Sequence, residues 1–172
     1  MGASHYIGAR CVPPCRCGIG GDTLTRAKRI PPPDSPSGTE RLDRDVLEQA
    51  GGTHVTLFMG TNDISKGASA AQVMAGMQEI IARVKASGLK IIGVTLIPRT
   101  GWDGTKTAIR HEVNDWIRHQ AGFDTVLDFD RVVRDAANPN VINPLFNCDE
   151  VHPNPFGYFV RGHPSTWRSC WV

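Results

Sequence analysis

An acid and a histidine near the C-terminal end of the chain are spaced so that they can act together. Asp149 lies three residues before His152 in the segment Asp-Glu-Val-His-Pro-Asn. A carboxylate at this spacing can hold an imidazole in one tautomer and stabilise its cation. The other ring nitrogen then remains available as a general base, so the pair suits acyl transfer.

Two segments earlier in the chain offer hydrogen-bond donors for such chemistry. Residues 18–22 form a glycine-rich turn, in which Gly21 would let the main chain approach a substrate closely. Asn62 follows an apolar run within the segment Gly-Thr-Asn-Asp. The backbone N–H of Gly21 and the side-chain amide of Asn62 are donors suited to a developing oxyanion. With Asp149 and His152 they form an acyl-transfer site that still needs a nucleophile.

The nucleophile has two candidates in the sequence. Ser4, in the segment Gly-Ala-Ser, is the nearest imitation of a nucleophilic serine motif, although no strand can precede it because Met1 starts the chain. Thr23 follows Gly21 and Asp22 and is the weaker candidate. The alternative interpretation of Ser4 is an ordinary terminal serine without a catalytic role.

Metal binding is a competing interpretation of the same residues. Asp149 and His152 could ligate a metal together with Cys148, but no further ligand is evident. Three more cysteines lie within residues 11–17, near His5, and their spacing fits no common structural zinc pattern. The total of five cysteines is odd, which argues against a disulfide framework. We therefore expect no metal and no cofactor.

Strands and helices that would position these residues alternate along the middle of the chain. The apolar, β-branched runs 53–59, 90–97 and 125–129 are typical of buried parallel strands. Between them, helical periodicity predicts one helix from the capping box at Ser69 to Gly88 and another over 109–122. This order predicts an α/β domain whose parallel sheet is covered on both faces. Sites in such sheets lie beyond the carboxyl ends of the strands, where the first run places the Gly-Thr-Asn-Asp segment.

Shorter elements and individual polar residues complete this prediction. Two further helices are expected over 38–51 and 131–137, and an irregular stretch over 138–147. Arg110 and Asn114 lie one helical turn apart and are expected to make surface or loop contacts. Asp63 should order the loop around Asn62. Trp102 lies in a glycine-flanked loop and could line the substrate pocket.

Length, composition and charge indicate what kind of protein the sequence encodes. The 172 residues are enough for a single domain spanning 1–172. A hydrophobic content of 40% and a charged content of 21% are ordinary for a globular domain. The net charge of +2 is too weak to indicate a nucleic acid or a membrane surface as partner. The first residues show no apolar signal-peptide core, so a cytoplasmic location is the default expectation.

The sequence resembles the SGNH, or GDSL-type, hydrolases over about residues 18–158. The glycine-rich turn at 18–22 is similar to the second block of that family, and Gly60 to Asp63 is similar to the third block. Asp149 and His152 stand where the fifth block has its Asp-x-x-His. The resemblance implies a three-layer α/β/α, flavodoxin-like fold, no cofactor, and hydrolysis of esters with short acyl chains or of acetylated sugars.

The two ends of the chain depart from the family pattern. The first block, Gly-Asp-Ser-Leu or similar, which ends the first strand and supplies the serine, is not found. Residues 1–17 and 159–172 are atypical, and codons compatible with 164–172 can be re-read out of frame as an apolar helix. We therefore expect a first strand that is missing or replaced, and a homodimer that covers the exposed sheet edge. The alternative function is a truncated or frameshifted remnant that is catalytically impaired or inactive, with at most a binding role.

Overall fold

The computed structural model describes residues 17–26 and 35–162. Ser4, His5, Cys11 and Cys15 therefore lie outside the described residues, and their predicted roles stay predictions.

A parallel sheet of three strands forms the centre of the described fold. Its strands are β1 (His54–Leu57), β2 (Lys90–Val94) and β3 (Thr125–Leu127), in that order across the sheet. This arrangement confirms the predicted α/β class with a parallel sheet. Parallel neighbours require crossover connections, and α3 and α4 supply them between successive strands.

β2 is shorter than the predicted run 90–97. Near the end of that run, the side chain of Asn114 binds the backbone in place of a neighbouring strand. The side chain of Asn114 accepts a hydrogen bond from the Leu96 backbone N–H at 2.7 Å and donates one to the Leu96 carbonyl at 2.8 Å. Leu96 is buried, so both of its backbone groups need such a partner. The Thr95 N–H still donates to the Leu127 carbonyl of β3 at 3.2 Å, and at Leu96 the Asn114 side chain takes the place of a strand partner.

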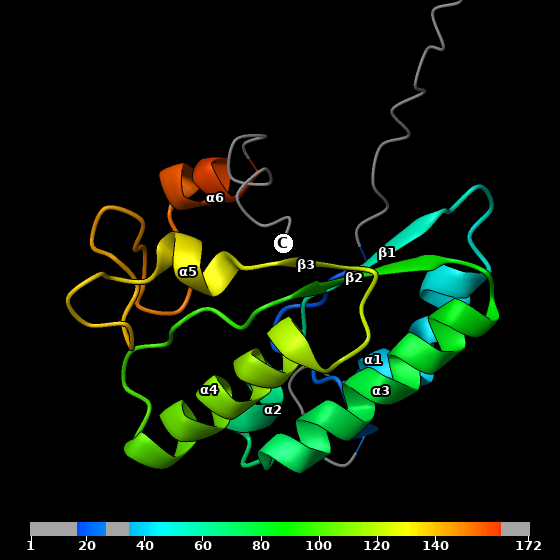
Figure 1. The fold of residues 1–172 in the computed structure, drawn as a ribbon, viewed down its shortest axis with the longest axis horizontal. Coiled ribbons are helices and arrows are strands. Elements are labelled where there is room, and N and C mark those ends of the chain that lie inside the picture. The colour runs from blue at the N-terminus through cyan, green and yellow to red at the C-terminus, as the bar shows by residue number, and fades with distance from the viewer. Residues whose placement is uncertain (1–16, 27–34, 163–172) are drawn as a thin grey trace, which may run out of the picture.

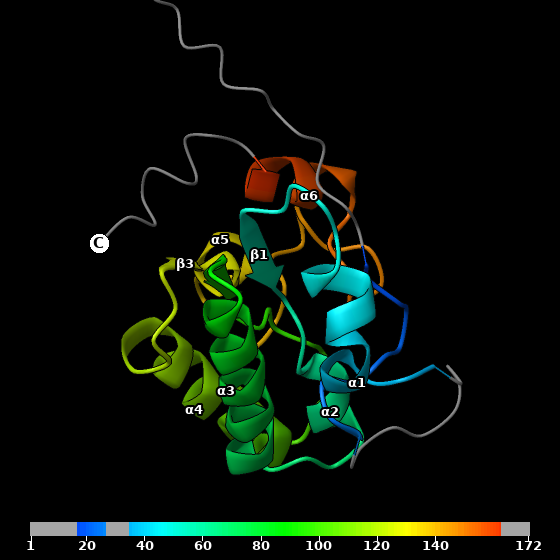
Figure 2. The ribbon, with the colours of Figure 1, turned by 90° about the vertical axis from the view of Figure 1, so that its right-hand side faces the viewer.

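Helices lie on both sides of the sheet (Figures 1 and 2). The helices α1 to α4 lie on one side, α6 lies on the other, and α5 follows the carboxyl end of β3 at the level of the sheet. None of the described helices is both long and apolar enough to cross a bilayer. The elements are α1 (Gly38–Leu42), which continues into the π-helical η2 (Asp43–Leu47), α2 (Thr61–Ser65), α3 (Ala70–Ala86), α4 (Gly104–His119), α5 (Phe129–Val133) and α6 (Pro155–Gly162).

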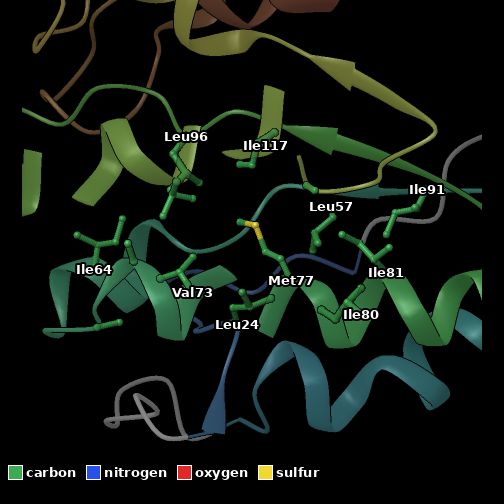
Figure 3. Packing of buried hydrophobic residues seen from close by; sticks show 14 of the residues in the cluster. Leu24, Leu57, Ile64, Val73, Met77, Ile80, Ile81, Ile91, Leu96 and Ile117 are labelled. Carbon is green, nitrogen blue, oxygen red and sulfur yellow. The ribbon is translucent and has the colours of Figure 1, made fainter. Parts of the chain in front are cut away.

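The main core lies between α3 and the sheet. Val73, Met77 and Ile81 on one face of α3 pack into a cluster with Leu57 of β1 and Ile91 of β2 (Figure 3). The predicted capping box is present, since the Ser69 side chain accepts from the Gln72 N–H and the Gln72 side chain from the Ser69 N–H. The predicted end is present too: Gly88 has φ 76°, the left-handed conformation that glycine adopts after a helix.

Two helices begin earlier than the periodicity predicts, and an aspartate explains each shift. Asp103 caps α4 by accepting from the Lys106 N–H at 2.8 Å, so the helix starts at Gly104. Asp128 caps α5 in the same way for the Arg131 N–H at 3.2 Å. The prediction of a helix over 131–137 is therefore wrong: the helix spans Phe129–Val133, and Asp128 is its cap rather than a strand residue.

The outer edge of β1 pairs with no other strand among residues 17–26 and 35–162. His54 and Thr56 of this strand are exposed, and Phe58, which follows it, is also partly open. An open edge is what the sequence predicts if the first strand of the family is missing or replaced. That a second copy of the chain covers this edge stays a prediction.

Candidate active site

The glycine-rich turn and Asn62 lie next to each other at the carboxyl end of β1. Gly60 ends the strand segment with φ 115° and places α2 directly beyond it. A Cβ atom at Gly60 would come within 3.0 Å of Val73 Cγ1, so this tight junction requires glycine. From α2, the Asn62 side-chain amide donates to the Asp22 carbonyl at 2.8 Å. The structure thus joins two segments that are forty residues apart in the sequence.

Two buried carboxylates hold this turn in place. Asp22 accepts from the guanidinium of Arg41, with Nη2 at 2.9 Å and Nε at 3.0 Å from the same oxygen. Asp63 accepts from the backbone N–H groups of Leu24 at 2.8 Å and Thr25 at 3.1 Å. Burial raises the pKa of the Asp63 carboxyl despite these hydrogen bonds, which lower it. These contacts agree with the expected role of Asp63, which is to order the loop.

The donor groups expected to bind an oxyanion remain available. Gly21 has φ 75°, and its carbonyl accepts from the Lys66 ammonium at 3.1 Å. The Gly21 N–H has no hydrogen-bond partner within the described part of the chain. The Asn62 amide uses one of its two N–H groups on the Asp22 carbonyl, which leaves the other for a ligand. Two N–H donors therefore lie on segments that a hydrogen bond joins, and that both bind one oxyanion stays a prediction.

Asp149 and His152 form the predicted pair. Nδ1 of the ring lies 2.8 Å from the Asp149 carboxylate, and the side chains are 64% and 53% exposed for His152 and Asp149 respectively. Asp149 also accepts from the backbone N–H groups of Val151 at 3.1 Å and His152 at 2.7 Å. The ring hydrogen bond, with the two backbone ones, lowers the pKa of Asp149 to about 2. A carboxylate that stays ionised fixes the proton on Nδ1 and leaves Nε2 to act as a base.

Glu150 lets the chain turn sharply between this acid and this base. It is the one described non-glycine residue with positive φ, at 68°. Its carbonyl accepts from the Thr100 N–H at 3.0 Å, and the Cys148 N–H donates to the His152 carbonyl at 3.0 Å. Left-handed residues other than glycine persist only where the surroundings fix them, and they gather at functional sites. Here, the turn at Glu150 lies between Asp149 and His152, whose side chains come within 2.8 Å of each other.

A loop after β2 links the donor half of the site to the acid–base half. Trp102 Nε1 donates to the Ser65 hydroxyl at 3.3 Å, and Ser65 lies three residues after Asn62 on α2. Thr100, two residues before Trp102, holds the Glu150 carbonyl at the other side. Within the described part of the chain, no hydrogen bond joins His152 directly to Gly21 or Asn62. This loop therefore contacts both groups of site residues, and Trp102 within it is partly buried against the main core. That Trp102 lines the substrate pocket stays a prediction.

Among the described residues, no hydroxyl group is hydrogen-bonded to the His152 ring. Thr23 is buried, and its hydroxyl donates to the Thr25 carbonyl at 3.1 Å, so this candidate is wrong as an accessible nucleophile. Four described serines make hydrogen bonds with groups other than the His152 ring: Ser37, Ser65, Ser69 and Ser87. The candidate Ser4 lies outside the described residues. That Ser4 supplies the nucleophile stays a prediction.

Within the described part of the chain, a cluster of metal ligands or an open hollow could also mark a site. Among the described residues, no three His, Cys, Asp or Glu side chains gather in a way that could hold a metal ion. An open hollow of about 370 Å³ lies between the starts of α3 and α4, and Ala68, Asp103 and Ile109 contribute to its walls. It contains none of the predicted site residues, so chemistry and geometry, rather than hollow size, locate the site.

Sequence reasoning missed two buried polar residues that shape the surroundings. The sequence predicts surface or loop contacts for Arg110 and Asn114: both contact loop segments, but they do so from buried positions and not at the surface. Arg110 donates to Asp130 at 2.6 Å and to the Pro139 carbonyl at 3.1 Å, and Asn114 holds the Leu96 backbone. Burial lowers the pKa of the Arg110 guanidinium, although Asp130 raises it. The available signal was their helical spacing with Val113 and Ile117, which places them beside the apolar face of α4.

Solved structures share this fold. A lipolytic protein of the G-D-S-L family from Desulfitobacterium hafniense has 24% identity and a TM-score of 0.62, over 76% of this chain and 72% of its own. A GDSL-like lipase from Bacteroides thetaiotaomicron has 19% identity and a TM-score of 0.61, over 71% of this chain. The match spans 63% of that lipase. An acetyl-xylooligosaccharide esterase from Geobacillus has 18% identity and a TM-score of 0.61, over 90% of this chain and 70% of its own.

Sequence comparison identifies the family. Among curated proteins, no sequence matches the chain. The model of the GDSL-like Lipase/Acylhydrolase family matches residues 5–159, which is most of the chain and includes Gly21, Asn62, Asp149 and His152. The matched range begins one residue after Ser4. The chain therefore belongs to the GDSL-like Lipase/Acylhydrolase family.

Proposed function

We propose that the chain hydrolyses esters of short acyl or acetyl groups, acetylated carbohydrates among them. The observation that carries this proposal is the Asp149–His152 pair, with Nδ1 at 2.8 Å from the carboxylate and the ring open to solvent. Membership of a family of lipases and acylhydrolases supports it. The acetyl-xylooligosaccharide esterase among the structural relatives supports the acetyl ester class, through the shared fold alone.

In the proposed reaction, Nε2 of His152 takes the proton of a hydroxyl group as its oxygen attacks the acyl carbon. The carbonyl oxygen becomes an oxyanion, which the Gly21 N–H and the Asn62 amide bind. Asp149 stabilises the imidazolium that forms. The imidazolium then gives its proton to the leaving alcohol, and a water molecule, deprotonated by the same ring, releases the acid from the acyl-enzyme.

Ser4 is the serine we propose as the source of that hydroxyl group. No cofactor takes part in this reaction, and a small ester is the only partner it needs. Hydrolysis of p-nitrophenyl acetate by the wild-type chain and by the Ser4→Ala and His152→Ala variants tests the mechanism. We expect either substitution to reduce kcat/KM by on the order of a hundredfold or more. Activity that survives His152→Ala would exclude the proposed base.

A second candidate function is a non-catalytic remnant that binds an acyl or carbohydrate group without hydrolysing it. The observation that favours it concerns the nucleophile: the family match starts after Ser4, and no serine of the described residues is hydrogen-bonded to the His152 ring. A fluorophosphonate probe separates the two candidates. Stoichiometric labelling that requires His152 supports the hydrolase, and failure to label supports the remnant.

A further inference from the structure

The loop that carries Asp149 and His152 has little packing to hold its shape. Both side chains are mostly exposed, and the neighbouring Cys148 and Glu150 are exposed as well. Its two limbs are joined by main-chain contacts, which include an antiparallel bridge between residues 147 and 153. Hydrogen bonds at the base of the loop therefore have to determine where the His152 ring lies.

Asn154 makes those hydrogen bonds at the base of the loop. Its carboxamide Nδ2 donates to the carbonyls of Leu145 at 3.0 Å and Asn147 at 3.3 Å. Its backbone N–H donates to the Phe146 carbonyl at 2.7 Å. One residue on the outgoing limb thus holds three successive carbonyls on the incoming limb, two residues after His152.

The same side chain also fixes the start of α6. Asn154 Oδ1 accepts from the Gly157 N–H at 2.9 Å, as a residue capping a helix does. A Cβ atom at Gly157 would lie 2.9 Å from the Phe146 carbonyl oxygen, so the helix approaches the loop as closely as glycine allows. Farther along α6, the Arg161 guanidinium lies 4.3 Å from the ring centre of Phe129 and 5.0 Å from that of Phe58. Through α6, Asn154 connects the loop to the ends of β3 and β1.

We infer that Asn154 is a positioning residue for the proposed hydrolysis: it fixes the His152 ring between Asp149 and the substrate. This inference rests on the proposed function for its effect on catalysis. A carboxamide is required because it combines two N–H donors with an acceptor in one plane. Serine can still cap α6 through its hydroxyl, but it cannot reach both carbonyls of the incoming limb.

Asn154→Ser is the test variant, because it keeps a capping oxygen and removes the two carboxamide donors. Asn138→Ser is the matched control: Asn138 accepts from the Asn140 N–H at 3.2 Å in the same irregular stretch, away from the loop base. For p-nitrophenyl acetate, we expect Asn154→Ser to lower kcat by about tenfold to a hundredfold with little change in KM, as a displaced catalytic group does. We expect Asn138→Ser to match the wild type. Unchanged kcat for Asn154→Ser would overturn the inference.

The tautomer of the His152 ring gives a second measurement that does not require activity. The Asp149 contact favours a proton on Nδ1, and nitrogen NMR of the neutral ring reports which nitrogen carries it. We expect Asn154→Ser to shift the ring toward the tautomer ratio of an Asp149→Ala variant, at a temperature where both remain folded. A wild-type ratio in Asn154→Ser would overturn the inference. If the wild-type chain hydrolyses no ester, the proposed hydrolysis fails, and the tautomer ratio still decides whether Asn154 positions the ring.

Discussion

The molecule contains two pairs of a carboxylate and a basic side chain that have similar geometry and opposite surroundings. Arg110 and Asp130 lie 2.6 Å apart, and each side chain is 1% exposed. Asp149 and His152 lie 2.8 Å apart in a loop that is open to solvent. The separation of the charged atoms therefore does not distinguish a pair that holds the fold from one that can act on a substrate.

Burial and the remaining partners make the difference. Asp130 also accepts from Arg118 at 2.7 Å and Arg134 at 3.4 Å, so that its oxygens are saturated with donors inside the protein. His152, in contrast, uses one ring nitrogen on Asp149, and its other ring nitrogen has no hydrogen-bond partner among residues 17–26 and 35–162. A buried pair that loses one member leaves an uncompensated charge, whereas an exposed pair leaves a solvated one. The comparison predicts effects on stability for the first pair and on chemistry for the second.

The largest effect is expected for Arg110→Met. It removes the donor to Asp130 Oδ1, while Arg118 and Arg134 still pair with Oδ2, and it removes the donor to the Pro139 carbonyl. Two acceptors that lose a buried donor should lower the free energy of unfolding by about 3 kcal/mol. Urea denaturation measures this change. Arg131→Met is the control, because Arg131 is 64% exposed and lies 3.3 Å from Asp128. We expect that control to cost less than about 1 kcal/mol, and equal losses for the two variants would contradict the comparison.

His152→Ala should give the reverse result. We expect the free energy of unfolding to stay within about 0.5 kcal/mol of the wild type, because the ring is mostly exposed. Labelling by a fluorophosphonate probe should fall at least about a hundredfold, since the nucleophile loses its base. Denaturation and labelling of the same preparation measure both. A large loss of stability would mean that this pair, too, holds the fold.

Asp63→Asn extends the comparison to a carboxylate that binds backbone groups. Its oxygens accept from the N–H groups of Leu24 and Thr25, so an amide would turn a donor toward a donor. We expect a loss of about 1–3 kcal/mol in the free energy of unfolding. Asp103→Asn is the matched control, because Asp103 caps α4 with one oxygen and asparagine caps equally well. Similar stabilities for both variants would count against the role of Asp63 in holding the turn.

The smallest effect concerns the titration of Asp149. Its pKa of about 2 lies below the ordinary 3.8, so its contribution to stability is present above about pH 4 and is lost as the pH falls toward 2. In His152→Ala, we expect the carboxyl midpoint, followed by carbon NMR, to move up toward 3.8. Asp124 provides the control, because the Ile91 N–H lowers its pKa and His152 does not contact it. A midpoint that stays near 2 would show that the ring does not cause the shift.

Much of the fold could be predicted because local signals and tertiary packing agree there. The helix after Ser69 has a capping box, an apolar face and a terminal glycine, and α3 follows all three. The Asp149–His152 contact could also be predicted, because three residues of separation leave few arrangements of the two side chains. The proximity of Gly21 to Asn62 needed the family resemblance, since no local pattern joins these segments.

The rest depended on contacts that a one-dimensional pattern does not contain. From their polarity, Arg110 and Asn114 look like surface residues. Hydropathy does not show that Arg110 has a buried partner in Asp130, or that Asn114 has one in the Leu96 backbone. Asp128 looks like part of a strand until the fold shows it capping α5. In each case a polar side chain satisfies a distant polar group, and its partner becomes evident only when the chain is folded.

The attachment of α6 has a consequence for the response to ionic strength. Arg161 is buried against the faces of Phe58, Phe129 and Tyr158, where mobile ions have little access. Concentrated sodium chloride should therefore weaken surface ion pairs such as Arg26–Glu40 while the C-terminal helix stays docked. We therefore expect the distance between the His152 loop and the end of β1 to stay the same when the sodium chloride concentration is raised.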